Sequence, residues 1–524
     1  MAGLVSSLGM NANTLKVNEN AIAVVSNNVA NINTEGYHKQ TVNLATKTNE
    51  IPIGNNVYRQ IDSLAGVQIA SVTRNTNKYL DNAYRDALSG LAGLEQQSAN
   101  VADIADLFEE LEGTGIDAAL KKFFSALDDL NNYPTDSTAR VAFLESAKVL
   151  TNIVNTTATE LQRQGIAQMG DGVDPGLLAE SPFAQDIQGL GDLFKELAEV
   201  NDALARTQTG SLTANNLLDT RDTVLDKIAK YMDFEVEENP NGTVNLSIDG
   251  VELVKGNQVK AEFKVETASE YCGREGITYP DDWDGALAVV KLETIDGRTY
   301  DNMNERLNTG KLGGYLVHGS DENGKVDAHY ILGKLDDLAT VIADVFNRLQ
   351  TDEHAFCINT TTWTLSDANR NTALFVSSDG TAINSSNIKI NDALLADGGQ
   401  WLIAAAYVED LNNIDVNAVG NNGNVVNMLN TREAAQAGLG GLTFEDYYTA
   451  LVGKVGTALG DLNSEIEAQQ AIADNLDLQK TSEYSVNLNS ELVDMIKYQT
   501  AYQAAARVFS TCSSLLETLV YLGN

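Results

Sequence analysis

Two residues have the types and the spacing of a metal-binding pair. His354 and Cys357 are separated by three positions, so one helical turn would bring an imidazole and a thiolate to the same face. A structural zinc site needs about four ligands, and no nearby third and fourth ligand completes this set. We therefore predict no metal site and no bound cofactor.

Two short segments have part of the sequence of a ligand-binding loop. The segment from Asp321 to Asp327 has the acidic start of a calcium loop but lacks the bidentate glutamate at its far end. We interpret it as a solvated Asx turn. Leu312-Gly313-Gly314 has the glycines of a phosphate loop without its lysine and serine, and we interpret it as a tight turn.

Catalytic motifs are not recognisable in the chain. No serine or cysteine has a general base and an orienting acid near it in the sequence, so we predict no enzyme. The aromatic residues leave one hypothesis open, a binding module or adhesin in which Tyr271, Trp283 and Trp401 line a ligand groove. Core packing is the more common use of such side chains.

Composition excludes further classes of function. The chain carries 73 acidic and 35 basic residues, a formal net charge of −38, which disfavours binding to nucleic acids and to anionic membranes. No apolar stretch approaches the ~18 residues of a membrane helix, and the start lacks the pattern of a cleaved signal peptide. The three cysteines, Cys272, Cys357 and Cys512, are widely spaced and indicate no disulfide framework.

Both ends of the chain carry a long apolar stripe. Apolar residues recur every seven positions between Leu4 and Ile32 and between Val486 and Leu522, as they do in paired helices. A lone helix in water could not bury either stripe, so we predict an antiparallel pair that also contacts neighbouring copies. Asn11 and Asn18 interrupt the first stripe and are expected to fix its register. The residues predicted to form this interface are Leu8, Leu15, Ile22, Val29, Met495, Tyr502, Phe509 and Leu516. The ordinary core of a monomeric bundle is the alternative.

The periodicity changes along the rest of the chain. Residues 75–228 have helical spacing, whereas residues 234–267 alternate and contain Asn241-Gly242 and Asp249-Gly250, which are typical of hairpin turns. We predict a mainly α fold with an inserted antiparallel β domain, a long helical bundle and a coiled-coil-like terminal pair. The expected divisions are 1–74 (N-terminal half of the terminal coiled-coil domain, and linker), 75–232 (first part of the bundle), 233–327 (inserted β domain), 328–352 (return helix), 353–399 (short β insert), 400–484 (last part of the bundle) and 485–524 (C-terminal half of the terminal domain).

The end of the first stripe carries a more specific pattern. Residues 26–37 read Ser-Asn-Asn-Val-Ala-Asn-Ile-Asn-Thr-Glu-Gly-Tyr, and the asparagines and the glycine favour a sharp helix exit. This run resembles the signature near the N-terminus of bacterial flagellar axial proteins, Asn-Asn-aliphatic-Ala-Asn followed by Asn-Thr-x-Gly-Tyr. Glu35 stands where that family usually has proline.

Further segments resemble the hook-associated protein 1 family, in one order over nearly the whole chain. They are residues 114–136, Leu217-Leu218-Asp219-Thr220-Arg221-Asp222, Leu312-Gly313-Gly314, Ala343-Asp344-Val345-Phe346-Asn347, Thr443-Phe444-Glu445-Asp446-Tyr447, Val486-Asn487-Leu488-Asn489 and residues 498–504. That family often has a larger outer domain before its C-terminal helices. The corresponding stretch is short here, so we expect a modest outer domain.

The resemblance implies a structural role in the bacterial flagellum. It implies a subunit at the junction of hook and filament, which polymerises through its terminal helices and is exported unfolded by the flagellar type III channel. The partners it implies are further copies in a ring or helical layer, hook protein, hook-associated protein 3 and a cytosolic chaperone at the C-terminal helix. We expect the chain to be extracellular, in the flagellum.

Overall fold

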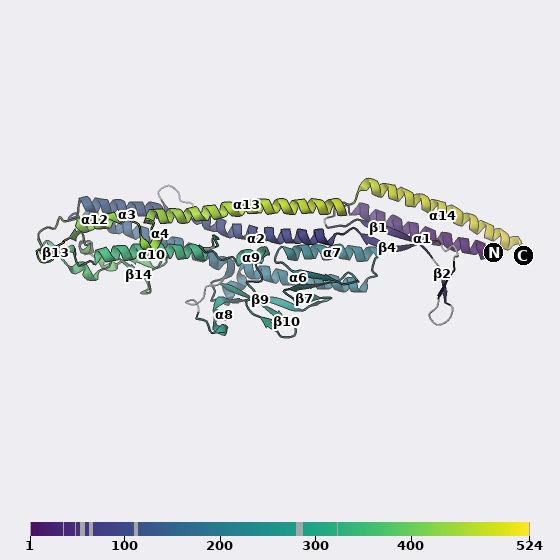
Figure 1. Ribbon diagram of the computed structural model, residues 1–524, viewed down its shortest axis with the longest axis horizontal. Helices are drawn as coiled ribbons and strands as arrows, with labels where there is room; N and C mark the ends of the chain where they lie inside the picture. The colour runs from purple at the N-terminus through teal and green to yellow at the C-terminus, as the bar shows by residue number, and fades with distance from the viewer. Residues whose placement is uncertain are drawn as a thin grey trace.

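The computed structural model describes residues 2–34, 36–47, 49–52, 58–61, 66–108, 114–278, 287–321 and 323–522. Glu35 and Trp283 lie outside this part of the chain. The molecule is a long rod whose two chain ends lie side by side at one extremity, with a β domain on one flank of the middle (Figure 1). Within the described part, no helix combines the length and the hydropathy of a membrane span.

The rod is built from long helices that run along its axis. They are α2 (Lys78–Phe108), α3 (Gly115–Asn132), α4 (Ser137–Met169), α6 (Pro182–Arg206), α7 (Leu212–Ala229), α10 (Ala328–Gln350) and α13 (Phe444–Tyr484), with the short α5 (Pro175–Glu180) and α9 (Gly310–Tyr315). Side-chain oxygens cap several of these helices: Asp136 accepts from Thr138 N, and Ser211 accepts from Ala214 N. The long bundle predicted from the apolar spacing is confirmed.

The far half of the rod has a closed aromatic core. Phe123 is fully buried, and its ring centroid lies 5.4 Å from that of Phe124, 5.3 Å from that of Phe143 and 5.0 Å from that of Phe346. These four side chains come from α3, α4 and α10, so one cluster joins helices that are distant in sequence. A second core lies between α6, α7 and the β domain.

The inserted antiparallel β domain is confirmed. It contains β5 (Glu235–Glu238), β6 (Val244–Ile248), β7 (Val251–Lys255) and β8 (Gln258–Val259) in one sheet, and β9 (Ala261–Thr267), β10 (Ala288–Thr294) and β11 (Thr299–Tyr300) in another, with α8 (Ala268–Glu275) after β9. Asp249 and Gly250 have positive φ angles of 47° and 76°, as the predicted tight turn between β6 and β7 requires.

A smaller β region lies at the far end of the rod and extends beyond the residue 399 expected from sequence. It contains β12 (Ala355–Asn359), β13 (Thr364–Ser366), β14 (Phe375–Ser377), β15 (Ile388–Ile390) and β16 (Ala406–Tyr407), with the short helices α11 (Asp392–Leu395) and α12 (Gly423–Asn430). β16 pairs with β12. Buried amides hold this added segment, because Gln350 Oε1 accepts from Ala404 N at 3.1 Å and Asn424 donates to Ala404 O at 2.7 Å.

The terminal module consists of α1 (Ala2–Ala30), α14 (Leu488–Leu522) and two β-hairpins. β1 (Gln40–Thr46) pairs with β4 (Val67–Arg74), and β2 (Asn49–Pro52) pairs with β3 (Tyr58–Ile61). The sequence predicts a linker after the first helix and does not predict these strands. β1 and β4 pack on α1, so part of the expected linker belongs to the folded module.

Candidate functional site at the terminal helices and their joint with the rod

The two terminal helices lie against each other in opposite directions, as predicted, and the last turn of α14 ends beside the start of α1 (Figure 1). α14 follows α13 after only three residues, Ser485, Val486 and Asn487. The terminal pair therefore continues the axis of the rod past a short joint.

On α1, the buried side chains lie beside the residues predicted for the interface. Leu8, Leu15, Ile22 and Val29 are all half-buried. Among the side chains of α1 that the structure describes, the buried ones are Asn11, Val17, Asn18, Ala21, Val24, Val25 and Asn28. The face that packs within the molecule is therefore shifted away from Leu8, Leu15, Ile22 and Val29, and it contains asparagines, valines and an alanine.

The stripe of α14 is buried to a smaller extent. Met495, Phe509 and Leu516 are half-buried, whereas 39% of Tyr502 is exposed. The fully buried residues of this helix are Glu491 and Ala505, within the described chain. Phe509 and Leu516 are thus only partly covered, and the buried apolar position of the described helix is a small residue, Ala505.

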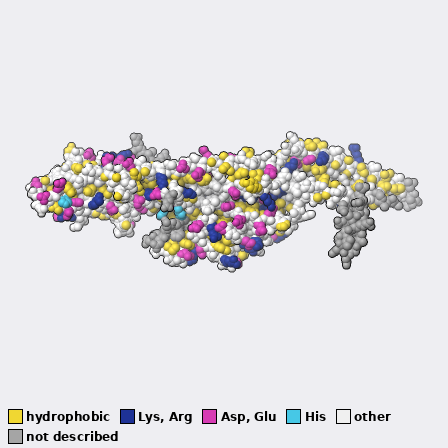
Figure 2. Space-filling view, viewed as in Figure 1, with side chains coloured by type: hydrophobic (Ala, Val, Ile, Leu, Met, Phe, Trp, Pro, Cys, Tyr) yellow, Lys and Arg dark blue, Asp and Glu magenta, His cyan; other side chains and the backbone are white. Residues whose placement is uncertain are grey.

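α14 also exposes large apolar side chains along its length. Val493 is 65% exposed and Ile496 is 63% exposed. The other exposed apolar residues of this helix are Leu488, Leu492, Tyr502, Val508, Leu515, Leu519, Val520 and Tyr521. Figure 2 shows hydrophobic side chains over the surface of the terminal pair. We call these residues the outer face of α14. Exposed apolar surface of this kind is typical of an interaction site.

The asparagine-rich motif ties the end of α1 to β1. Asn28 accepts from Gln40 N at 3.0 Å and from the Tyr37 hydroxyl at 2.8 Å. Asn27 donates to the same hydroxyl at 2.9 Å, and Asn31 donates back to Asn27 O. Burial raises the pKa of Tyr37 to about 12, so its hydroxyl stays protonated and can donate to Asn28. Asn28 therefore pairs the buried N–H of Gln40 in β1, and Tyr37 links Asn27 to Asn28.

The segment that follows the motif is held on α7 by charged groups. His38 is buried, its Nδ1 lies 2.8 Å from Asp219 Oδ1, and its ring centroid lies 4.6 Å from that of Tyr484. Arg74, at the end of β4, bonds both Asp219 at 2.6 Å and Asp222 at 2.9 Å. One guanidinium therefore joins the β1–β4 hairpin to two turns of α7.

Asp222 is the centre of this ionic network. Burial by itself would raise the pKa of its carboxyl group, but the guanidinium groups of Arg221, Arg74 and Arg85 lower that pKa to about 2. Arg221 Nη2 lies 2.6 Å from Asp222 Oδ1. Because several cations surround the carboxylate, Asp222 stays ionised although it is buried.

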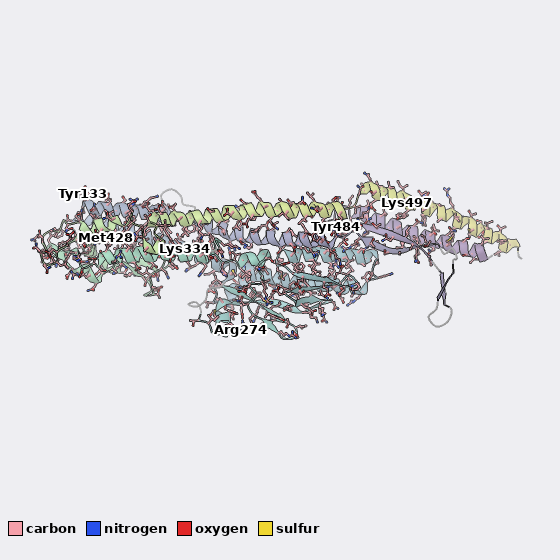
Figure 3. The ribbon with its side chains drawn as sticks, viewed as in Figure 1. Tyr133, Arg274, Lys334, Met428, Tyr484 and Lys497 are labelled. Atoms are coloured by element: carbon pink, nitrogen blue, oxygen red, sulfur yellow. The ribbon has the colours of Figure 1, made fainter. Side chains whose placement is uncertain are left out.

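The network continues to the long helices of the rod. Asp226 bonds Arg85 of α2 at 2.7 Å and Lys480 of α13 at 3.2 Å. The hydroxyl of Tyr484, at the end of α13, lies 3.2 Å from Asp81 of α2. Figure 3 labels Tyr484 where the rod helices meet the terminal module. We call this network, from His38 to Tyr484, the joint.

α14 is attached at the joint through Glu491. Its carboxylate accepts from Asn28 Nδ2 at 2.9 Å and lies 2.8 Å from Lys39 Nζ, and only 2% of the side chain is exposed. Sequence reasoning missed Glu491, Lys39, Asp219 and Asp222 as site residues. The signal for Glu491 was an acidic residue seven positions before Tyr498, at a companion position of the apolar stripe.

The residues considered for metal binding and catalysis are engaged in the fold. His354 Nδ1 lies 2.8 Å from Val408 O, and Cys357 is buried in β12. Among the described residues, no three His, Cys, Asp or Glu side chains are grouped closely enough to hold a metal ion. Asp321 Oδ2 lies 2.7 Å from Lys334 Nζ and Oδ1 lies 3.0 Å from Lys454 Nζ, and these bonds lower the pKa of the carboxyl group.

The two loop interpretations have different outcomes. Asn323 Oδ1 accepts from Lys325 N at 2.8 Å, which is the predicted Asx turn. The tight turn predicted at Leu312-Gly313-Gly314 is wrong, because these residues lie within α9. A Cβ atom at Gly314 would lie 2.6 Å from Gly93 O, so the glycine allows α9 to pack closely on α2.

Two of the three aromatic residues of the binding-module hypothesis, Trp401 and Tyr271, do not converge, and the third, Trp283, lies outside the described residues. Trp401 packs on Trp363 with ring centroids 5.1 Å apart, and the guanidinium of Arg140 lies 5.2 Å above its ring. Tyr271 is in the β domain, where Arg274 lies 5.3 Å from its ring. The two side chains therefore belong to separate parts of the rod.

Three family models of flagellar proteins match the chain. The model for the flagellar hook-associated protein FlgK helical domain matches residues 101–356. The models for the flagellar basal body rod FlgEFG protein C-terminal region and for the flagella basal body rod protein match residues 481–522 and 9–38, which are the two terminal helices.

The relatives that match nearly the whole chain are named flagellar hook-associated protein 1. Flagellar hook-associated protein 1 of Escherichia coli is 24% identical over 98% of this chain and 99% of its own. The proteins of that name from Salmonella typhimurium and Bacillus subtilis are 23% and 21% identical, over 95% and 97% of this chain and 96% of their own. The structure of the flagellar hook junction protein FlgK from Burkholderia pseudomallei is 12% identical, with a TM-score of 0.54 over 78% of this chain and all of that one, and it shares the fold.

Proposed function

The chain belongs to the flagellar hook-associated protein 1 family, and from this premise we propose that it is a structural subunit at the junction between hook and filament. The family is a structural component of the bacterial flagellum. Its members act by assembly, so the proposed work of this chain is to bind further copies of itself and the neighbouring flagellar proteins.

The outer face of α14 is the observation that supports polymerisation. Val493 and Ile496 are more than half exposed, and exposed apolar surface lowers the free energy of association when a neighbour covers it. The formal net charge of −38 acts against this association in the free molecule. We infer that the outer face is covered by the terminal helices of adjacent subunits.

The stripe residues then have two roles. Leu8, Leu15, Ile22 and Val29 on α1 and Met495, Phe509 and Leu516 on α14 are half-buried within one subunit, so a neighbour could cover what remains exposed. Tyr502, with 39% of its side chain exposed, is available to a neighbouring copy. We propose that the half-buried residues link the inner seam to the contacts between subunits.

The neighbours follow from the family. We propose hook protein on one side of the assembled layer and hook-associated protein 3 on the other, and export through the flagellar type III channel to the outside of the cell. Before export, a cytosolic chaperone would cover the outer face of α14, because exposed apolar helices associate non-specifically.

The proposal is tested by charged substitutions on the outer face. Val493→Asp with Ile496→Asp should leave the monomer folded and prevent incorporation, because assembly would bury unpaired carboxylates. The measurement is electron microscopy of flagella from a strain that carries only the variant, with the circular dichroism of the purified monomer as a check on folding.

Val141→Asp is the matched control. Val141 is an exposed valine of α4, in the far half of the rod, so this variant should assemble normally. Filaments of normal length with the double variant at the hook junction would refute the proposed role of the outer face. Absence of the wild-type protein from purified hook–basal bodies would refute the proposed location.

A further inference from the structure

Within the described chain, α14 forms side-chain hydrogen bonds or ion pairs with another element only through Glu491. Asn487 and the hydroxyls of Thr500, Thr511, Ser514 and Thr518 bond backbone groups near them in sequence, and Asp494 pairs with Lys497 of its own helix. Ala505, in the middle of α14, is buried without any polar group of its own. Apolar contacts set no strong preference between neighbouring registers, because a helix surface repeats with every turn.

The amides expected to fix the register do not cross the pair. Asn11 Nδ2 donates to Ser7 O at 2.8 Å, and Asn18 Nδ2 donates to Thr14 O at 2.8 Å, so both bond the backbone of α1 itself. They fill the inner face without specifying which residue of α14 lies opposite. The register must therefore be fixed elsewhere.

Glu491 has the geometry to fix it. The side chain is buried in the first turn of α14, its Oε2 accepts from Asn28, and its Oε1 lies 2.8 Å from the ammonium group of Lys39. Asn28 in turn is held by Gln40 and Tyr37. A slip of α14 by one turn would move Glu491 by about 5 Å and would leave a buried carboxylate without its partners.

We propose that Glu491, with Asn28 and Lys39, fixes the register of α14 against α1. This register determines which apolar residues of α14 face neighbouring copies. Glu491 acts as a positioning residue, since its own side chain is covered. Its consequence for assembly rests on the proposed function, whereas its effect on register does not.

The consequence for assembly follows from the position of Glu491 in the first turn of α14. The outer face of α14 has exposed residues near the joint, such as Leu492 and Ile496, and others near the free end, such as Leu515 and Leu519. A one-turn slip would displace all of them together along the pair. Copies of the chain in different registers would then present different surfaces to their neighbours. A regular layer of subunits requires every copy to present the same surface.

The register can be measured in the monomer by pulsed electron spin resonance. Spin labels on the exposed positions Asn20 and Ser510 suit this measurement. In the antiparallel pair, Asn28 lies beside Glu491. Asn20 precedes Asn28 by eight residues and therefore lies opposite residue 499. Ser510 is eleven residues further along α14, a displacement of about 16 Å along the axis. Cys512 would be replaced by alanine, while Cys272 and Cys357 are buried and do not react.

The decisive variant is Glu491→Leu, which fills the site with an apolar side chain and removes the bonds to Asn28 and Lys39. We expect the single distance of the wild type to shift by about 5 Å or to divide into several distances, with unchanged helix content. Glu491→Gln keeps the bond to Asn28 and should retain one distance.

Asp494→Leu is the matched control, because Asp494 is a half-buried acid one turn further along the same helix (Figure 3 labels its neighbour Lys497). This control should keep the wild-type distance. An unchanged distance in Glu491→Leu would overturn the proposal, and so would a loss of helix content, since Glu491 would then hold the helix itself and not its register. A failure of the wild-type protein to assemble would count against the proposed function alone.

Discussion

The aromatic core of the far half of the rod and the terminal pair are both built from long helices, yet they bury their apolar residues to very different extents. Phe123, Phe143 and Leu127 are completely covered in the rod core. On α14, by contrast, Ala505 is the one apolar side chain in the described part of the helix that is fully buried. The rod is complete within one molecule, whereas the terminal pair leaves its outer face for other molecules to cover.

The difference follows from geometry. In the rod, α3, α4, α10 and α13 enclose a common space, so one phenylalanine contacts several helices. Two helices alone share only one line of contact, and more than half of each surface stays exposed. A pair of this kind becomes fully buried only when further helices are added.

Removing an aromatic side chain from the rod core should have the largest effect on stability. Phe123→Ala should lower the free energy of unfolding by about 4 kcal/mol, since the cavity would lie among three other phenylalanines. Phe509→Ala, in the terminal pair, should cost only about 1 kcal/mol because the side chain is half-buried. Denaturant unfolding of both variants measures the two values, and equal losses would remove the distinction between the regions.

The joint should be sensitive to acid. The pKa of Asp222 falls from its ordinary value of 3.8 to about 2 in the folded protein, so this group stabilises the fold above pH ~4. That contribution, about 2 kcal/mol, should be lost as the pH falls through the folded pKa near 2.

The test compares unfolding free energies between pH ~5 and pH ~2 in the wild type and in Asp222→Asn. The variant lacks the titrating carboxyl group and should have a weaker dependence on pH over this range. The same slope in both proteins would mean that Asp222 is not held ionised by the arginines of the joint.

Two leucines provide a contrast between residues of one type. Leu127 is 0% exposed and Leu515 is 51% exposed. Leu127→Ala should destabilise the monomer by about 3 kcal/mol, whereas Leu515→Ala should change its stability by less than about 0.5 kcal/mol. Leu515→Ala should instead weaken self-association, which sedimentation at increasing concentration would detect. A clear loss of monomer stability in Leu515→Ala would place this side chain in a core.

Helix and strand assignments were predictable where the apolar pattern was long. The hairpin turn at Asp249-Gly250 and the stripe of α10 follow from local preferences, and both are confirmed. The β1–β4 hairpin was missed because α1 and α7 stabilise it. Asn28 of α1 and Asn215 of α7 bond the backbone of its strands, and Arg74 of β4 bonds Asp222 of α7. The glycines of α9 were wrongly predicted to form a turn. They are needed for the close contact with Gly93 of α2, which is distant in the sequence.

By itself, the sequence determined that both ends of the chain form apolar helices, that a β domain interrupts a helical bundle, and that the asparagine-rich motif closes the first helix. These features depend on neighbours within a few turns of chain. Only the tertiary structure decided which residues of the stripes face inward, that Glu491 reaches Asn28 across 463 positions of sequence, and that Asp219 and Asp222 join the hairpin to the rod. The physical reason is that burial and ion pairing depend on residues brought together from distant segments, and a periodic pattern does not specify its partner.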